Sequence, residues 1–170
     1  MVQKYQHRVF NVVYRILGDR AEAEELAQEV FIAVFKHVDS FRGDSKFSTW
    51  LFRIATNRAK NRVKYLARRN RDRHQDLDDT PESNIEKNPV GGETARPDRK
   101  AMGHELESVM QEGLEDLNEK HRTVIVLRDV ENLTYEEIAD VLEIAEGTVK
   151  SRLYRARSQL KDYIGERYDC

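Results

Sequence analysis

Aromatic and basic side chains that suit nucleic acid gather in one stretch of the chain, residues 41–73. Its first twelve residues include four aromatic residues, Phe41, Phe47, Trp50 and Phe52. Residues 42–73 carry eleven Lys and Arg against two Asp. Unstacked bases need flat partners and phosphates need cations, so this combination favours single-stranded nucleic acid. The alternative is an ordinary amphipathic helix with its aromatics in the core. It explains Phe47 and Trp50 well, but the excess of positive charge poorly.

One helix is predicted to carry most of this stretch, over residues 47–69, with a length of about 35 Å. Apolar side chains recur with helical spacing at positions 47, 51, 54, 55, 59, 63 and 66. Asn57 and Asn61 lie four residues apart and therefore share a face of this helix. Their amides can pair with donors or acceptors on the edge of a base.

Residues 133–159 have the pattern of a helix-turn-helix. Thr134 followed by Glu137 is a capping box, which starts a short helix with an apolar face. A turn follows at residues 143–145, and then a second helix. This second helix turns the following side chains outward: Thr148, Lys150, Ser151, Arg152, Tyr154, Arg155 and Arg157.

We expect the second helix of this motif to bind duplex DNA. Its N-terminal turns would read base edges and its later turns would bind phosphates, so Lys150 and Arg155 are the candidate base readers. Arg152 and Arg157 are candidates for phosphate contacts or ion pairs. Glu143 lies in the turn, where a residue that readily adopts the left-handed conformation is preferred. We expect Glu at this position to lower the stability of the turn by about 1 kcal/mol.

The chain is predicted to be all-α, with two small helical domains, residues 1–73 and 104–170. A flexible acidic linker, residues 74–103, joins them. It holds all three prolines and a Gly-Gly pair and lacks apolar periodicity. Its ~30 residues can span about 100 Å when extended. Residues 124–127, Val-Ile-Val-Leu, are rich in β-formers, but helical periodicity on both sides predicts a buried helix.

Two helices are predicted before the aromatic stretch. The first ends at Gly18, and the second covers residues 22–38 with an acidic N-terminal part. The helix macrodipole alone favours acidic side chains near a helix start, so this acidity has a structural explanation as well as a functional one.

Composition argues against an enzyme, a metal site or a cofactor. Five scattered His residues have no ligand spacing, and Gly91-Gly92 lacks the Lys of a phosphate loop. The single Cys, Cys170, excludes an internal disulfide framework, which fits a reducing cytoplasm. No apolar run exceeds six residues, which is too short to span a membrane. The formal net charge of −2 hides a segregation of charge along the chain.

Residues 41–61, FRGDSKFSTWLFRIATNRAKN, resemble the promoter-melting region of extracytoplasmic-function (ECF) sigma factors, the small alternative sigma subunits of bacterial RNA polymerase. The helix-turn-helix matches the same family. The resemblance implies that residues 1–73 are sigma domain 2, which docks on core polymerase and melts the minus-10 element. Residues 104–170 would be sigma domain 4, which reads the minus-35 element. The linker would span the ~70 Å between the two promoter boxes, which lie two DNA turns apart.

The resemblance also assigns residues. Those implied at the minus-10 element are Phe41, Asp44, Lys46, Phe52, Arg53, Asn57, Lys60 and Asn61. Those implied at the minus-35 element are the outward residues of the second helix named above. Those implied in docking on a coiled coil of the largest polymerase subunit are Glu25, Gln28, Glu29 and Ile32. The implied partners are core RNA polymerase, through this coiled coil and the flap, promoter DNA and an anti-sigma factor.

One other class of protein remains as an alternative. A stand-alone helix-turn-helix regulator of the response-regulator effector type would explain residues 133–159. It would not explain the aromatic and basic helix. Family members usually carry further helical sequence before the position where this chain starts, which leaves the extent of the first helix open.

Overall fold

The computed structural model describes residues 2–75 and 97–167, and within these ranges every regular element is a helix. The prediction of an all-α fold is confirmed. In chain order the helices are α1 (Val2–Leu17), α2 (Arg20–His37), the 3₁₀ turn η1 (Val38–Ser40), α3 (Phe47–Gln75), α4 (Pro97–Asp116), α5 (Glu119–Ile125), the π-helical turn η2 (Val126–Val130), α6 (Tyr135–Leu142) and α7 (Glu146–Arg167). No helix in the described part of the chain is long and apolar enough to cross a membrane.

The N-terminal domain is built from α1, α2 and α3. Gly18, with φ +80°, ends α1, and the Asp19 carboxylate accepts a hydrogen bond from the Glu22 amide to start α2. The spacing of apolar residues on α3 then buries Leu51, Ala55 and Ala59 against the first two helices. A three-helix core of this kind leaves the polar faces of α2 and α3 at the surface.

The C-terminal domain contains α4 to α7. Residues 124–127 are buried in α5 and η2, which confirms that this β-rich segment is helical. The predicted capping box is present. Thr134 Oγ1 accepts from the Glu137 amide, and the Glu137 carboxylate accepts from the Thr134 amide at 2.9 Å. This cap starts α6, and α7 follows after a three-residue turn.

The predicted linker boundaries are too wide. Residues 74–75 belong to α3 and residues 97–103 to α4, because helix formation continues past the last apolar residue of one helix and starts before the first of the next. The remainder, residues 76–96, lies outside the described residues. Twenty-one residues have a covalent reach of about 70–75 Å, not the 100 Å expected for residues 74–103.

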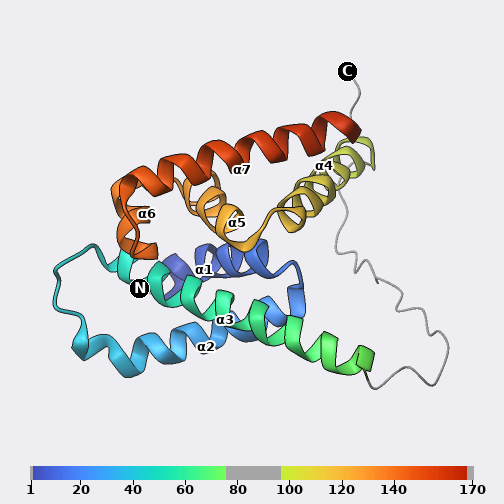
Figure 1. Ribbon diagram of the computed structural model, residues 1–170. Coiled ribbons are helices and arrows are strands. Elements are labelled where there is room, and N and C mark those ends of the chain that lie inside the picture. The colour runs from blue at the N-terminus through green and yellow to red at the C-terminus, as the bar shows by residue number, and fades with distance from the viewer. Residues whose placement is uncertain (1, 76–96, 168–170) are drawn as a thin grey trace.

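The two domains pack directly on each other, which the sequence did not predict. α1 lies between α3 on one side and α5 on the other, and α6 lies beside the start of α3 (Figure 1). Buried residues of both domains form one continuous apolar cluster, from Val9 in α1 to Leu160 in α7.

Candidate nucleic-acid and polymerase interfaces

A cluster of three aromatic rings in edge-on and tilted contact lies at the start of α3. Phe41, just before the helix, lies 5.3 Å from the Trp50 ring and 5.8 Å from the Phe47 ring, between centroids. These rings are only half-buried. Asn57 and Asn61 lie further along α3, and both are exposed. The structure therefore presents half-buried aromatic rings and two amides along α3, the two kinds of group that a displaced base requires.

Phe52 does not belong to this surface. Its ring has no exposed area and packs in the domain core, with the Arg8 guanidinium 5.0 Å from the ring centroid. A ring enclosed by its own fold offers no face to a base. The assignment of Phe52 to base stacking was therefore wrong. Phe52 was not part of the predicted apolar stripe, although its spacing from the buried residues Ala55 and Ala59 also fits a buried face.

The recognition helix of the helix-turn-helix is the first half of α7. Lys150, Ser151, Tyr154 and Arg155 are exposed on it, and Tyr154 retains 79 % of its accessible area. A large phenol ring that is exposed in a folded domain is available to a partner. Glu143 ends α6 in the left-handed conformation, with φ 55°, as the turn demands.

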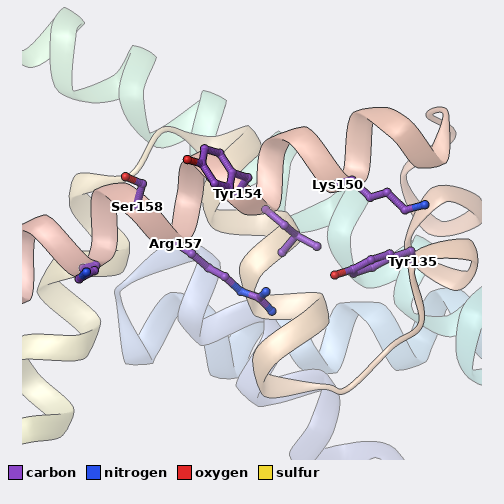
Figure 2. A pocket seen from close by; sticks show the side chains of 7 residues that line it. Tyr135, Lys150, Tyr154, Arg157 and Ser158 are labelled. Carbon is purple, nitrogen blue, oxygen red and sulfur yellow. The ribbon is translucent and has the colours of Figure 1, made fainter.

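Two hollows flank the recognition helix. One, of about 570 Å³, lies between α7 and the start of α5, and its lining includes Thr148, Ser151, Arg152 and Arg155. The other, of about 470 Å³, is lined by Lys150, Tyr154 and Arg157 together with Tyr135 of α6 (Figure 2). All the predicted minus-35 residues thus lie along α7, on the walls of these two hollows.

Arg157 forms an ion pair with Asp129. Its Nε lies 3.1 Å from the Asp129 Oδ2, and its Nη2 contacts the other carboxylate oxygen. The Asp129 carboxylate also raises the pKa of Arg157. Of the two roles predicted for Arg157, the structure shows the ion pair.

Tyr135 is a residue that sequence reasoning missed. The Lys150 ammonium lies 5.8 Å and the Arg128 guanidinium 5.2 Å from its ring centroid, both within reach of a cation–π interaction. Its position directly after the N-cap of α6 was the available signal, because the first turn of that helix faces the recognition helix.

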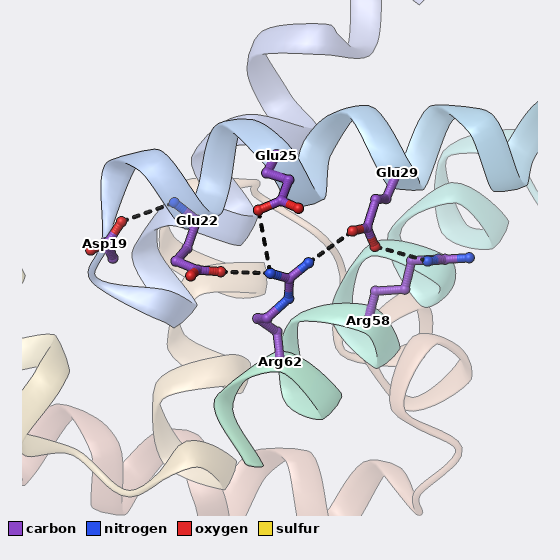
Figure 3. A network of polar contacts seen from close by, with 6 residues as sticks. All are labelled: Asp19, Glu22, Glu25, Glu29, Arg58 and Arg62. Carbon is purple, nitrogen blue, oxygen red and sulfur yellow. Dashed lines mark hydrogen bonds and ion pairs between the residues drawn. The ribbon is translucent and has the colours of Figure 1, made fainter. Parts of the chain in front are cut away.

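The polymerase candidates lie on α2, and not all of them are equally available. Glu25, Gln28 and Ile32 are exposed. Glu29 is half-buried because it binds α3: its carboxylate lies 2.8 Å from Arg62 Nη2 and 3.3 Å from Arg58 Nη1 (Figure 3). Two further exposed apolar residues, Phe35 and Val38, extend the surface of Ile32 at helical spacing. They were missed, although their spacing was legible in the sequence.

Arg62 lies at the centre of this polar network. Its Nη1 is 2.6 Å from Glu22 and 3.5 Å from Glu25, so three acids of α2 surround one guanidinium of α3 (Figure 3). These acids raise the pKa of Arg62. Part of the acidity of α2 therefore has a structural role, as the macrodipole argument also allowed.

No cluster of three metal-binding side chains occurs among the described His, Cys, Asp and Glu residues. What the described surface offers is half-buried aromatic rings at the start of α3, two exposed amides further along it, and an exposed recognition helix. These are means of binding nucleic acid.

Comparisons with known proteins agree with this geometry. Residues 1–79 match the family model for sigma-70 region 2, and residues 109–160 match that for sigma-70 region 4. The RNA polymerase sigma-H factor of Pseudomonas aeruginosa is 38 % identical over 160 residues, which cover 94 % of this chain and 82 % of that protein. The ECF RNA polymerase sigma-E factor of Escherichia coli K12 is 37 % identical over 164 residues, covering 96 % of this chain and 84 % of that protein.

Solved structures show the same fold. The sigma factor RpoE in complex with the anti-sigma factor NepR from Bartonella quintana superposes with a TM-score of 0.68 at 23 % identity, over 96 % of this chain and 93 % of that one. CnrH in complex with the cytosolic domain of CnrY gives a TM-score of 0.67 at 20 % identity, over 97 % and 85 % of the two chains.

The two helical domains, one with a helix-turn-helix, together with these matches identify a transcription initiation factor. The chain belongs to the sigma-70 family, in its ECF group. It is an alternative sigma factor that directs transcription initiation, and the stand-alone regulator is not favoured because region 2 is present.

Proposed function

We propose that this sigma factor divides promoter recognition between its two domains, with the residues named above. The N-terminal domain docks on core RNA polymerase through the exposed face of α2 and opens the minus-10 element with α3. The C-terminal domain reads the minus-35 element with α7. The observation that carries the proposal is the exposed face of α7, the second helix of the helix-turn-helix, with Lys150, Ser151, Tyr154 and Arg155.

At the minus-10 element, the proposal assigns Asn57 and Asn61 to the edge of a base displaced from the duplex. Phe41 is the aromatic candidate to stack on it, since its ring is half-exposed and braced by Trp50. Asp44, which is exposed in the loop before α3, is assigned to the same displaced segment. The cations Lys46, Arg53 and Lys60 are assigned to the phosphates of the displaced strand.

At the minus-35 element, Lys150 and Arg155 are assigned to base edges and Arg152 to a phosphate. Tyr154, on the same flank as Lys150, and Ser151 and Thr148, on the flank of Arg155, can contact thymine methyls or the sugar–phosphate backbone. Arg157 is assigned to the domain itself, because Asp129 holds its guanidinium.

On polymerase, Gln28 and Ile32 are assigned to the docking surface, with Glu25 at its rim. Glu29 acts through Arg58 and Arg62, by fixing α2 on α3. Solved sigma factors of this fold are bound to anti-sigma factors, which supports an anti-sigma partner for this chain too.

Reconstituted transcription tests the proposal. Core RNA polymerase would be mixed with the purified chain and a library of promoter fragments from the native genome, and the transcripts sequenced. We expect a set of promoters that shares two boxes about two DNA turns apart. Lys150→Ala should redistribute initiation by changing the upstream box, whereas Ile32→Ala should lower transcription from every promoter. If the chain gives no promoter-specific transcript with core polymerase, the proposal is wrong.

A further inference from the structure

The acidic face of α6 lies on the start of α3. Glu137, Asp140 and Glu143 follow each other at intervals of three residues and so occupy one side of α6 and its C-terminal turn. Glu137 Oε1 lies 2.8 Å from Lys46 Nζ. Arg53 Nη2 donates to the Asp140 carbonyl oxygen at 2.7 Å, and Arg53 Nη1 lies 3.8 Å from Glu143 Oε1.

The two cations in these contacts, Lys46 and Arg53, are the ones that the proposed function assigns to DNA phosphates. A third, Lys60, is half-buried on the same side of α3. Burial lowers the pKa of Lys60, and the charges of Glu119, Arg152 and Glu143 in the C-terminal domain also act on it. The Glu137 and Glu143 carboxylates and the Asp140 carbonyl of the C-terminal domain thus contact the cations of α3 where DNA phosphates would bind.

Further polar contacts join the two domains. Arg8 Nε of α1 lies 2.7 Å from the buried Glu131 carboxylate. Arg122 of α5 donates to the Ile16 carbonyl at 2.7 Å and to the Glu115 and Leu117 carbonyls of its own domain. Because these contacts are largely charge-assisted, added salt should weaken the exposed ones.

We propose that α6 occupies the minus-10 surface of α3 in the free protein and that promoter DNA and α6 compete for Lys46 and Arg53. This inference rests on the proposed minus-10 role of α3. Two promoter boxes two DNA turns apart are separated by about 70 Å. Domains in direct contact cannot read both, so recognition requires that the contact between α6 and α3 break.

This competition gives a function to Glu143. A left-handed turn residue is usually Gly, because a Cβ is strained at φ 55°. Glu143 tolerates that strain and adds a carboxylate next to Arg53. The residue therefore weakens the turn of the helix-turn-helix while strengthening the closed arrangement.

The experiment uses the full chain with Glu137→Gln and Glu143→Gln combined. Gln at position 137 retains the capping box but not the charge. The matched control is Asp162→Asn with Glu166→Gln, the same charge change at exposed positions near the end of α7. Spin labels at Ala67→Cys on α3 and Lys120→Cys on α5, with Cys170→Ser, report the separation of the domains by pulsed electron resonance. Fluorescence anisotropy with a labelled dT20 oligonucleotide reports access to the basic surface.

The unsubstituted chain and the control should show one narrow distance distribution and weak binding of dT20. The Gln variant should show a broader, longer distribution and bind dT20 about three- to thirtyfold more tightly, the effect of two ion pairs on an equilibrium. If the variant matches the control in both measurements, α6 does not close the chain and the inference is overturned. If the labels separate but dT20 affinity matches the control, closure is real but α6 covers no DNA-binding surface. In that case the minus-10 assignment of Lys46 and Arg53 is what fails.

Discussion

The Lys46 ammonium and the Glu137 carboxylate lie 2.8 Å apart, although 91 residues separate them in the chain. The other oxygen of Glu137 accepts a hydrogen bond from the Thr134 amide. One side chain therefore caps the first helix of the helix-turn-helix and binds the N-terminal domain. Stability of the cap and closure of the two domains are linked through it.

Glu137 should make the chain less stable in acid. The Lys46 ammonium and the Thr134 amide hold the pKa of Glu137 below its ordinary value of 4.5. The unfolded chain then binds more protons than the folded one below pH 4.5, so the stabilisation is present above that pH and is lost as the pH falls through the folded pKa. Urea unfolding of Glu137→Gln between pH 6 and 3 should show a flatter decline than the parent chain. Parallel curves would contradict this role.

Glu131 should have the opposite effect. Burial raises the pKa of its carboxyl above 4.5, and the Arg8 guanidinium only partly offsets this. The folded chain binds more protons, so the contribution of Glu131 to stability is greatest below pH 4.5 and falls as the pH rises through the folded pKa. Glu131→Gln should therefore gain stability relative to the parent as the pH rises from 4 to 7, measured by the same urea titration. A gain in unfolding free energy that is independent of pH would show that ionisation of Glu131 does not cause the pH dependence.

Glu143→Gly should stabilise the C-terminal domain. Gly removes the Cβ strain of the left-handed turn, worth about 1–2 kcal/mol, but loses about 0.5–1 kcal/mol to the entropy of the unfolded chain. A net gain of about 0.5–1 kcal/mol corresponds to a rise in Tm of roughly 1–4 °C. Asn132→Gly is the matched control, because Asn132 has φ 57° but tolerates that conformation better. Calorimetry that gives equal shifts for both variants would argue against strain at Glu143.

Much of the fold could be predicted because helical periodicity reports which face of a helix is buried. The stripe on α3, the capping box of α6 and the buried residues 124–127 were all legible from spacing alone. The packing of the two domains was not. The Arg8–Glu131 and Lys46–Glu137 pairs join residues 123 and 91 positions apart. A charged residue that pairs across such a distance looks, in the sequence, like any solvated residue.

The same limit explains the errors at the site. Phe52 lies one residue from the core position Leu51 and could be read as buried or as base-stacking. Only the packing of α1, which places Arg8 over the Phe52 ring, decides between these two interpretations. Arg157 could likewise be a phosphate anchor or an ion-pair partner, and the position of Asp129 decides.

Arg155→Ala and Arg157→Ala should affect binding in different ways. Loss of Arg155, a proposed base reader, should weaken binding to the cognate minus-35 duplex by about 1–3 kcal/mol and leave non-cognate binding nearly unchanged. Loss of Arg157 should instead destabilise the domain, because it removes a partly exposed pair worth about 0.2–1 kcal/mol. A double-mutant cycle with Asp129→Ala, measured by urea unfolding, should show coupling for Arg157 only. Coupling for Arg155 as well would contradict the division of roles.

Phe52 and Asn57 should now behave differently from each other. Phe52 is fully buried, so Phe52→Ala should cost about 3–5 kcal/mol of unfolding free energy and report on folding rather than on promoter opening. Asn57 is exposed, so Asn57→Ala should leave stability unchanged. Any defect of Asn57→Ala in transcription can therefore be assigned to DNA.

Permanganate reactivity of unpaired thymines in the minus-10 element, compared on duplex and pre-opened bubble templates for Asn57→Ala, tests the central claim most directly. A base is available to Asn57 only after the strands separate, so assembly with core polymerase should be normal. Loss of a base contact worth about 1–3 kcal/mol should lower opening of the duplex promoter roughly tenfold or more. The bubble template should restore most transcription, since its strands are already unpaired. Normal opening of the duplex promoter by Asn57→Ala, or failure of the variant to join polymerase, would contradict the account.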